Sequence, residues 1–173
     1  MDRAMRRTAL VDSSSAIILF KACLFEYTAE YFRIVIPASV FEELTVGGRS
    51  GSEEFARYRA DGSIQVRDTD PLLTVEGDMG GLDTGERDTI LLYEAGSGEV
   101  ILLDDGKGAA ICRRRRIPHI NALLVPRIFR RAGTINVEEC ERQMATIMIH
   151  GRYSDWVVDY ARSCPDDDLA DFA

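Results

Sequence analysis

The chain has 173 residues, which is enough for one domain with a substantial core and too few for two domains of ordinary size. Hydrophobic residues make up 46% and charged residues 29%, a composition that is typical of globular proteins and excludes the disordered and fibrous classes. The formal net charge is −8, with Asp+Glu 29 against Lys+Arg 21, so the surface as a whole does not attract nucleic acid. Any contact with nucleic acid must therefore use a local basic patch or a bound cation.

The four cysteines show no CxxC spacing, and two histidines are too few to complete the usual zinc patterns with them. We expect reduced, mostly buried thiols, which suit a cytoplasmic protein. Near the N-terminus, Asp12 and three serines interrupt the apolar residues, and no apolar segment reaches the roughly 18 residues that a membrane span needs. We therefore expect a cytoplasmic protein without this type of secretion signal and without membrane contact.

Short apolar segments alternate with helical patterns, which predicts a mostly parallel sheet covered by helices. The expected strands are residues 8–11, 33–36, 64–66, 100–103 and 117–120. The expected helices are residues 14–25, 38–46, 52–60, 83–95, 109–115 and 122–132. Ser50 and Glu53 have the spacing of a capping box for the third helix, and the polar residues 67–81 are expected to form an exposed flap.

The C-terminal part of the chain has two further helical patterns. Asn136 is expected to cap a helix that ends at His150 before Gly151, and Ser154 to cap a last helix over residues 155–163. We expect residues 1–135 to form the main α/β domain and residues 136–173 a helical hairpin packed on the same domain. The arginines at 113–116 and at 127, 130 and 131 are expected to lie on solvated helix faces.

Several acidic residues are placed where the predicted strands end. In an open parallel sheet, ligands bind outside the carboxyl ends of the strands. The acids that the pattern directs to this edge are Asp12, Glu42 or Glu43, Glu86, Asp104 and Asp105. Such a group would repel itself, and a divalent cation is the usual remedy. Because hard oxygen ligands favour Mg²⁺ or Mn²⁺, phosphodiester hydrolysis is the natural reaction.

Each of these acids also has a structural interpretation. Asp12, Asp104 or Asp105 could cap the helix that follows it, and Asp83 with Glu86 has the spacing of a capping box. Lys107 is either a phosphate contact or an ordinary surface lysine. The placement of the acids at one edge of the sheet, and no single acid among them, predicts the site.

The chain resembles the PIN-domain ribonucleases. The resemblance lies in LVDSS (residues 10–14), IPASVFEEL (36–44), LDTGERDTILLYEAG (82–96) and the segment from VILLDD to GTI (100–135), with HGRYSDWVVDYARS near the C-terminus. It is strongest with a prokaryotic branch related to the nuclease toxins of toxin–antitoxin operons. The resemblance implies a three-layer α/β/α fold with a central, mostly parallel sheet and an acidic cluster that binds Mg²⁺ or Mn²⁺ and cleaves RNA.

The resemblance also implies the role of each residue. It makes Asp12, Glu43, Glu86 and Asp105 the metal ligands, with Asp104 sharing the catalytic site. It puts Ser13 or Ser14 beside Asp12, and we expect Ser13 to steady the ligands; Lys107, a candidate from the residues themselves, is the expected substrate contact. Position 86 holds glutamate where many relatives have aspartate, and Asp88 is an alternative two residues on.

The implied function is an Mg²⁺- or Mn²⁺-dependent endoribonuclease that acts as the toxin of a toxin–antitoxin pair, with RNA, an antitoxin protein and a second copy of the chain as partners. The alternative is a catalytically weak PIN-like module that acts through an antitoxin or self-association. Apolar residues in 24–32 and 145–161 would supply its interface. A two-component receiver domain is disfavoured, because its acidic pair follows the first strand whereas Asp104 and Asp105 follow a late one.

Overall fold

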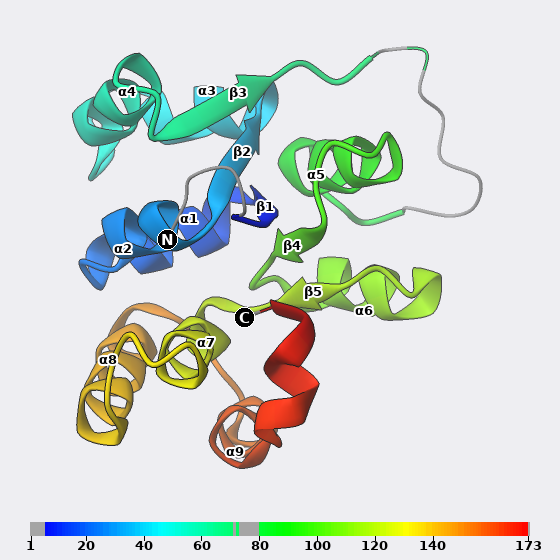
Figure 1. Cartoon of the computed structure of the whole chain (residues 1–173). Helices are drawn as coiled ribbons and strands as arrows, with labels where there is room; N and C mark the ends of the chain where they lie inside the picture. The colour runs from blue at the N-terminus through cyan, green and yellow to red at the C-terminus, as the bar shows by residue number, and fades with distance from the viewer. Residues whose placement is uncertain (1–5, 71, 73–79, 173) are drawn as a thin grey trace.

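In the computed structural model, which describes residues 6–70, 72 and 80–172, the strands form one parallel sheet in the order β3-β2-β1-β4-β5 (Figure 1). The strands are β1 (Thr8–Val11), β2 (Arg33–Pro37), β3 (Ile64–Arg67), β4 (Val100–Leu102) and β5 (His119–Ile120). Each neighbouring pair is parallel. The predicted parallel sheet is thus confirmed, with β1 at its centre.

Helices follow or connect the strands. They are α1 (Ser13–Lys21), α2 (Phe25–Tyr31), α3 (Ala38–Thr45), α4 (Ser52–Ala60), α5 (Thr84–Glu94), α6 (Gly106–Arg115), α7 (Val125–Arg131), α8 (Val137–His150) and α9 (Asp155–Ser163), with 3₁₀ turns η2 (Ala122–Leu124) and η3 (Asp166–Phe172). The single helix predicted over residues 14–25 ends early, because Cys23 has a φ of 58° and turns the chain before α2. Pro126 lies in the first turn of α7, where proline needs no N–H partner, so the helix predicted over residues 122–132 begins as η2.

The sheet is apolar on both faces, as a covered parallel sheet requires. Alternate strand residues, such as Ala9 and Val11, belong to a large core with α1–α4, α7 and α8. The residues between them, such as Leu10 and Ile101, pack against α5 and α6 in a smaller core. Figure 1 shows α5 and α6 on one side of the sheet. The predicted three-layer α/β/α fold is therefore confirmed.

The predicted bounds of α4 are correct, but the predicted capping box at its start was wrong. Its N-cap is Gly51, with a φ of 91° and no side-chain cap, so Ser50 and Glu53 form no capping box. A Cβ at Gly51 would also lie 2.8 Å from Cε1 of Phe20. The aromatic packing under α4, together with the left-handed backbone, requires glycine here. The flap predicted over residues 67–81 lies largely outside the described residues.

Arg127 is buried, contrary to the prediction of a solvated arginine cluster. Its guanidinium donates to the carbonyl oxygens of Ala161, Arg162 and Cys164 at 2.6, 2.7 and 2.8 Å, and to Asp166 at 3.0 Å. These contacts fasten the end of α9 and the chain after it to α7. Arg127 is a structural anchor because carbonyl oxygens surround it.

The C-terminal helices begin where the sequence indicates. Asn136 caps α8, its side chain accepting from the N–H of Glu139 at 2.8 Å, and α8 supplies Cys140, Met144 and Ile147 to the large core. Ser154 precedes α9 without a side-chain cap bond. The division into residues 1–135 and 136–173 stays a prediction. All four cysteines are free thiols, with Cys23 exposed. Within the described residues, no helix is both long and apolar enough to cross a membrane.

Candidate active site

The carboxyl ends of the central strands place the acidic residues at one edge of the sheet. β1 and β4 are in register, with Val11 opposite Leu102, and the N–H of Asp12 donates to the carbonyl of Leu102 at 3.1 Å. Because the strands are parallel, Asp12 and Asp104 both emerge at this edge. The ladder continues to β5, since the N–H of Leu103 donates to the carbonyl of Ile120 at 2.9 Å.

Asp12 is buried at the start of α1, with 2% of its surface exposed. Its Oδ1 accepts from the N–H of Ser15 at 2.8 Å and its Oδ2 from the hydroxyl of Ser14 at 2.6 Å. Burial raises the pKa of Asp12 to about 7, although these hydrogen bonds oppose it; the charge of Asp104 raises it further. Asp12 is thus a helix cap and a carboxyl group that is poorly stabilised when ionised. Ser13 lies half-buried next to it.

Asp104 is held by donors from three separate segments. Its Oδ2 accepts from the hydroxyl of Ser15 at 2.6 Å and from the N–H of Ala122 at 3.1 Å. Its Oδ1 accepts from the hydroxyl of Tyr153 at 2.6 Å. Burial raises the pKa of Asp104 against these hydrogen bonds. Ser15 therefore connects the two acids, its N–H to Asp12 and its hydroxyl to Asp104.

Asp105 points to a different neighbour, Glu86. It caps α6 through the N–H groups of Lys107 and Gly108, at 2.7 and 3.3 Å, and is hydrogen-bonded to the carboxyl group of Glu86. Burial raises the pKa of Glu86 to about 7, and the contact with Asp105 adds to this. Burial alone would raise the pKa of Asp105, but its hydrogen bonds hold that pKa below the ordinary value. Of the two groups, Glu86 is therefore the one that takes up a proton more readily.

Glu86 also belongs to the capping box that the sequence left open as an alternative. Its N–H donates to Asp83 at 2.8 Å, and its Oε2 accepts from the N–H of Asp83 at 3.0 Å. The structural interpretation is therefore correct for Glu86, and it coexists with the contact to Asp105.

Glu43 approaches the N-terminus of α5 from α3. Its Oε2 lies 4.0 Å from the position that a Cβ would take at Gly85, while its Oε1 pairs with Arg49 at 2.9 Å. The same Cβ would lie 2.9 Å from Cγ2 of Val40, so glycine at 85 lets α3 and α5 pack closely. Glu42, the alternative on this helix, is exposed.

The remaining candidates have other contacts. Asp88 accepts from the hydroxyl of Ser39 at 2.6 Å. The Nζ of Lys107 lies 3.5 Å from the carbonyl of Gly81, and its charge helps to lower the pKa of Asp105. The side chain of Lys107 is exposed, and these contacts place it near the acidic edge.

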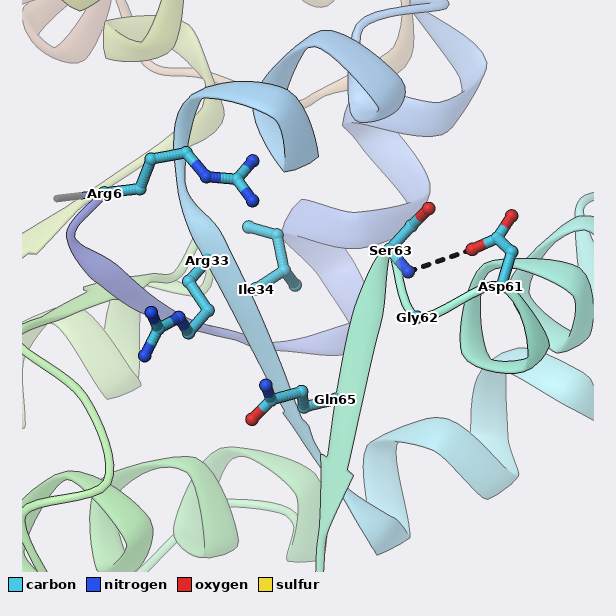
Figure 2. Close-up of a pocket in the computed structure, with 7 residues that line it drawn as sticks. All are labelled: Arg6, Arg33, Ile34, Asp61, Gly62, Ser63 and Gln65. Atoms are coloured by element: carbon cyan, nitrogen blue, oxygen red, sulfur yellow. Dashed lines mark hydrogen bonds between the residues drawn. The ribbon is translucent and has the colours of Figure 1, made fainter. Parts of the chain in front are cut away.

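A hollow elsewhere on the molecule contains none of the predicted site residues. Figure 2 shows it at the start of β2 and β3, with Arg6 and Arg33 on one side and Asp61, which accepts from the N–H of Ser63 at 2.9 Å, on the other. It lies at the amino ends of the strands, opposite the acidic edge. This hollow supplies a control position for tests of the acids.

The donor chemistry at the acidic edge fits a hard divalent cation. Asp12, Glu86, Asp104 and Asp105 offer only oxygen ligands. Among the residues that the structure describes, none forms an ion pair with these four acids, and no group of three or more His, Cys, Asp or Glu side chains is set to hold a metal ion. The acids meet instead as two neighbouring couples, Asp12 with Asp104 and Glu86 with Asp105.

Comparison with known protein families agrees with the fold and with the acids at its edge. A family model for a PIN domain matches residues 8–159, so the chain belongs to the PIN-domain family. PIN domains are usually nucleases that use divalent metal ions, which indicates a nuclease activity for this chain in general terms. No curated protein matches the sequence significantly.

Two side chains that donate to Asp104 were not predicted from the sequence. Ser15 had a signal, because it stands third in the run of serines after Asp12. Tyr153 had none, because it lies 49 residues from Asp104. No local periodicity relates residues at that separation, so only the folded chain places Tyr153 at the site.

Proposed function

We propose that the protein is a divalent-metal-dependent endoribonuclease that hydrolyses RNA phosphodiester bonds, and that it acts as the toxin of a toxin–antitoxin pair. The observation that carries the proposal is that the buried Asp12 and the half-buried Asp104 share Ser15 as a donor and have only neutral hydrogen-bond donors. Neighbouring carboxyl groups without a positively charged partner favour binding of a cation, and acids with shifted pKa values are typical of functional sites.

Asp12, Glu43, Glu86 and Asp105 would hold Mg²⁺ or Mn²⁺, with Asp104 beside them. A bound ion would supply an activated water and neutralise charge on the phosphate. Ser14 and Ser15 fix the carboxyl group of Asp12, and the N-terminus of α6 fixes that of Asp105. Glu86 must lose its proton before it can act as a ligand. Lys107 is close enough to Asp105 to contact a phosphate, and Ser13, half-buried beside Asp12, would steady the ligands.

The charge of the chain supports a selective substrate. A net charge of −8 gives little nonspecific affinity for a polyanion, since phosphate contacts supply most of that affinity. Arg113 and Arg116 are exposed at the far end of α6, roughly 15 Å along the helix from Asp105. They would contact the RNA backbone away from the cut, so we expect structured or sequence-limited RNA targets.

The test is cleavage of end-labelled RNA by the full chain with Mg²⁺, Mn²⁺ or EDTA. We expect cleavage with either ion, none in EDTA, and a rate roughly 10³-fold lower in Asp12→Asn, which corresponds to about 4 kcal/mol. Asp61→Asn, at the opposite edge of the sheet, is the matched control and should cut as well as the wild type. Equal activity in wild type and Asp12→Asn would reject the proposal, and cleavage of DNA alone would reject its RNA part.

One surface favours the second candidate, a binding module that acts through an antitoxin or self-association. On α9, Trp156 is 69% exposed and Tyr160 43% exposed, and their rings stack at 6.0 Å between centroids. Exposed aromatic residues of this kind are common in protein interfaces. If the mass in solution shows a dimer that Trp156→Ala dissociates, and no RNA is cut, the binding module is the better description.

A further inference from the structure

Tyr153 lies in the short connection between α8 and α9, yet its side chain reaches the acidic edge. Its hydroxyl donates to Oδ1 of Asp104 at 2.6 Å, and the residue is half-buried. Hydrogen bonds from hydroxyl to carboxylate at this distance are among the strong ones. A part of the chain beyond β5 thus contacts a residue that follows β4.

The contact settles how the carboxyl group of Asp104 is oriented. Oδ2 has two donors, the hydroxyl of Ser15 and the N–H of Ala122. Oδ1 has the hydroxyl of Tyr153, and otherwise, among the described residues, only the longer 3.3 Å contact from Ala122. Without Tyr153, the carboxyl group could rotate about its last bond. Because Ser15 also donates to Asp12, such rotation would disturb both acids.

The absence of a side chain at Gly151 leaves room for the ring of Tyr153. A Cβ at Gly151 would lie 2.3 Å from Cε2 and 2.8 Å from the hydroxyl oxygen of Tyr153. The φ of Gly151 is −101°, which any residue can adopt, so backbone conformation does not require glycine there. The ring of Tyr153, folded back over the chain toward Asp104, requires it.

We propose that Tyr153 is a positioning residue for metal binding: it orients Asp104 and, through Ser15, the neighbouring Asp12. The proposal rests on the proposed function, because it assigns a role within the same acidic site. It makes the connection between α8 and α9 a part of the active site. Tyr153 itself touches neither substrate nor metal.

The test measures Mn²⁺ affinity by calorimetry on the full chain, together with kcat and KM for RNA. Tyr153→Phe removes the hydroxyl and keeps the ring. We expect Mn²⁺ binding to weaken roughly 10- to 100-fold, as is common when a hydrogen-bond partner of a metal ligand is lost. At saturating RNA and fixed Mn²⁺, kcat should fall while KM for RNA stays within about twofold. Tyr93→Phe removes a hydroxyl near the C-terminal end of α5 and should change neither value.

Gly151→Ala is the second variant, because it displaces the ring without altering the hydroxyl. It should weaken Mn²⁺ binding in the same direction as Tyr153→Phe. If both variants fold and bind Mn²⁺ as the wild type does, the positioning role is overturned while the nuclease proposal stands. A lower melting temperature with unchanged Mn²⁺ affinity would overturn it too, since a purely structural role predicts that result. A wild type that neither binds Mn²⁺ nor cuts RNA would overturn the proposed function and this role with it.

Discussion

Two charged sites in this molecule, one at Arg127 and one at Asp12 and Asp104, differ in how the fold compensates their charge. Arg127 is surrounded by three carbonyl oxygens and Asp166, so its charge is matched where it lies. Asp12 is buried beside the half-buried Asp104, the donors to both are neutral, and the pKa of each is raised. The fold supplies acceptors to both terminal nitrogens of Arg127 and leaves the pair of acids short of positive charge.

This difference distinguishes a charged side chain with a structural role from charged side chains with a functional role. Removing a partner from a matched buried charge destabilises a protein strongly, because the remaining groups lose their hydrogen bonds. Neutralising one of two crowded carboxyl groups relieves repulsion and desolvation, so stability should rise while function falls. The comparison therefore predicts opposite signs for mutations in the two regions.

The largest effect is expected at Arg127. Arg127→Ala should lower the free energy of unfolding by roughly 3–5 kcal/mol, because buried carbonyl oxygens and Asp166 lose their donor. Urea denaturation of the full chain measures this. Arg131→Ala, on an exposed neighbouring position, is the control and should stay within about 0.5 kcal/mol of the wild type. A loss of less than 1 kcal/mol at Arg127 would contradict its role as an anchor.

Asp12→Asn should raise the free energy of unfolding when metal is absent. The pKa of Asp12 is raised to about 7 by burial, above its unfolded value, so its favourable contribution is complete at low pH and is lost as the pH rises through 7. In EDTA at pH 8 the variant should be more stable than the wild type by on the order of 2–4 kcal/mol, and by less at pH 5. Asparagine keeps an acceptor for the N–H of Ser15.

Urea denaturation at both pH values, with and without Mn²⁺, decides this prediction. Mn²⁺ should stabilise the wild type by mass action and leave the variant unchanged. A variant that is less stable than the wild type at pH 8 in EDTA would show that Asp12 acts mainly as a helix cap.

Glu86 should make metal binding depend on pH. Burial and the contact with Asp105 raise its pKa to about 7, so protons compete with the cation as the pH falls below that value. We expect the Mn²⁺ affinity of the wild type to drop between pH 8 and pH 6. Glu86→Gln should bind Mn²⁺ about tenfold more weakly at pH 8 and with a shallower dependence on pH. Glu42→Gln, an exposed glutamate of α3, should reproduce the wild-type curve.

The smallest effect is expected at Asp166. Hydrogen bonds from Arg127 and Arg130 lower the pKa of this exposed carboxyl group. Its stabilisation is therefore present above the unfolded pKa and lost as the pH falls through the lower folded value. Asp166→Asn should lower the melting temperature slightly at pH 7 and have no effect at pH 2. An equal effect at both pH values would mean that the charge is unimportant.

Much of the fold follows from local sequence patterns. The apolar segments around Leu10, Val35 and Ile101 predict the central strands because both faces of a covered sheet are apolar. Asn136 predicts the start of α8 because an asparagine side chain satisfies a free N–H group. Local patterns failed where the backbone adopts a left-handed conformation, at Cys23 and Gly51, since distant packing selects those turns.

The acidic site was predictable in its location and in its residue types, because strand ends in a parallel sheet share one edge. The sequence by itself determined that Asp12, Glu86, Asp104 and Asp105 would come to that edge. Only the tertiary structure decided that Asp104 faces Asp12 while Asp105 faces Glu86, and that Tyr153 and Arg127 hold their positions. Those contacts join residues far apart in the chain, where burial and hydrogen-bond geometry decide the partners and no local period records them.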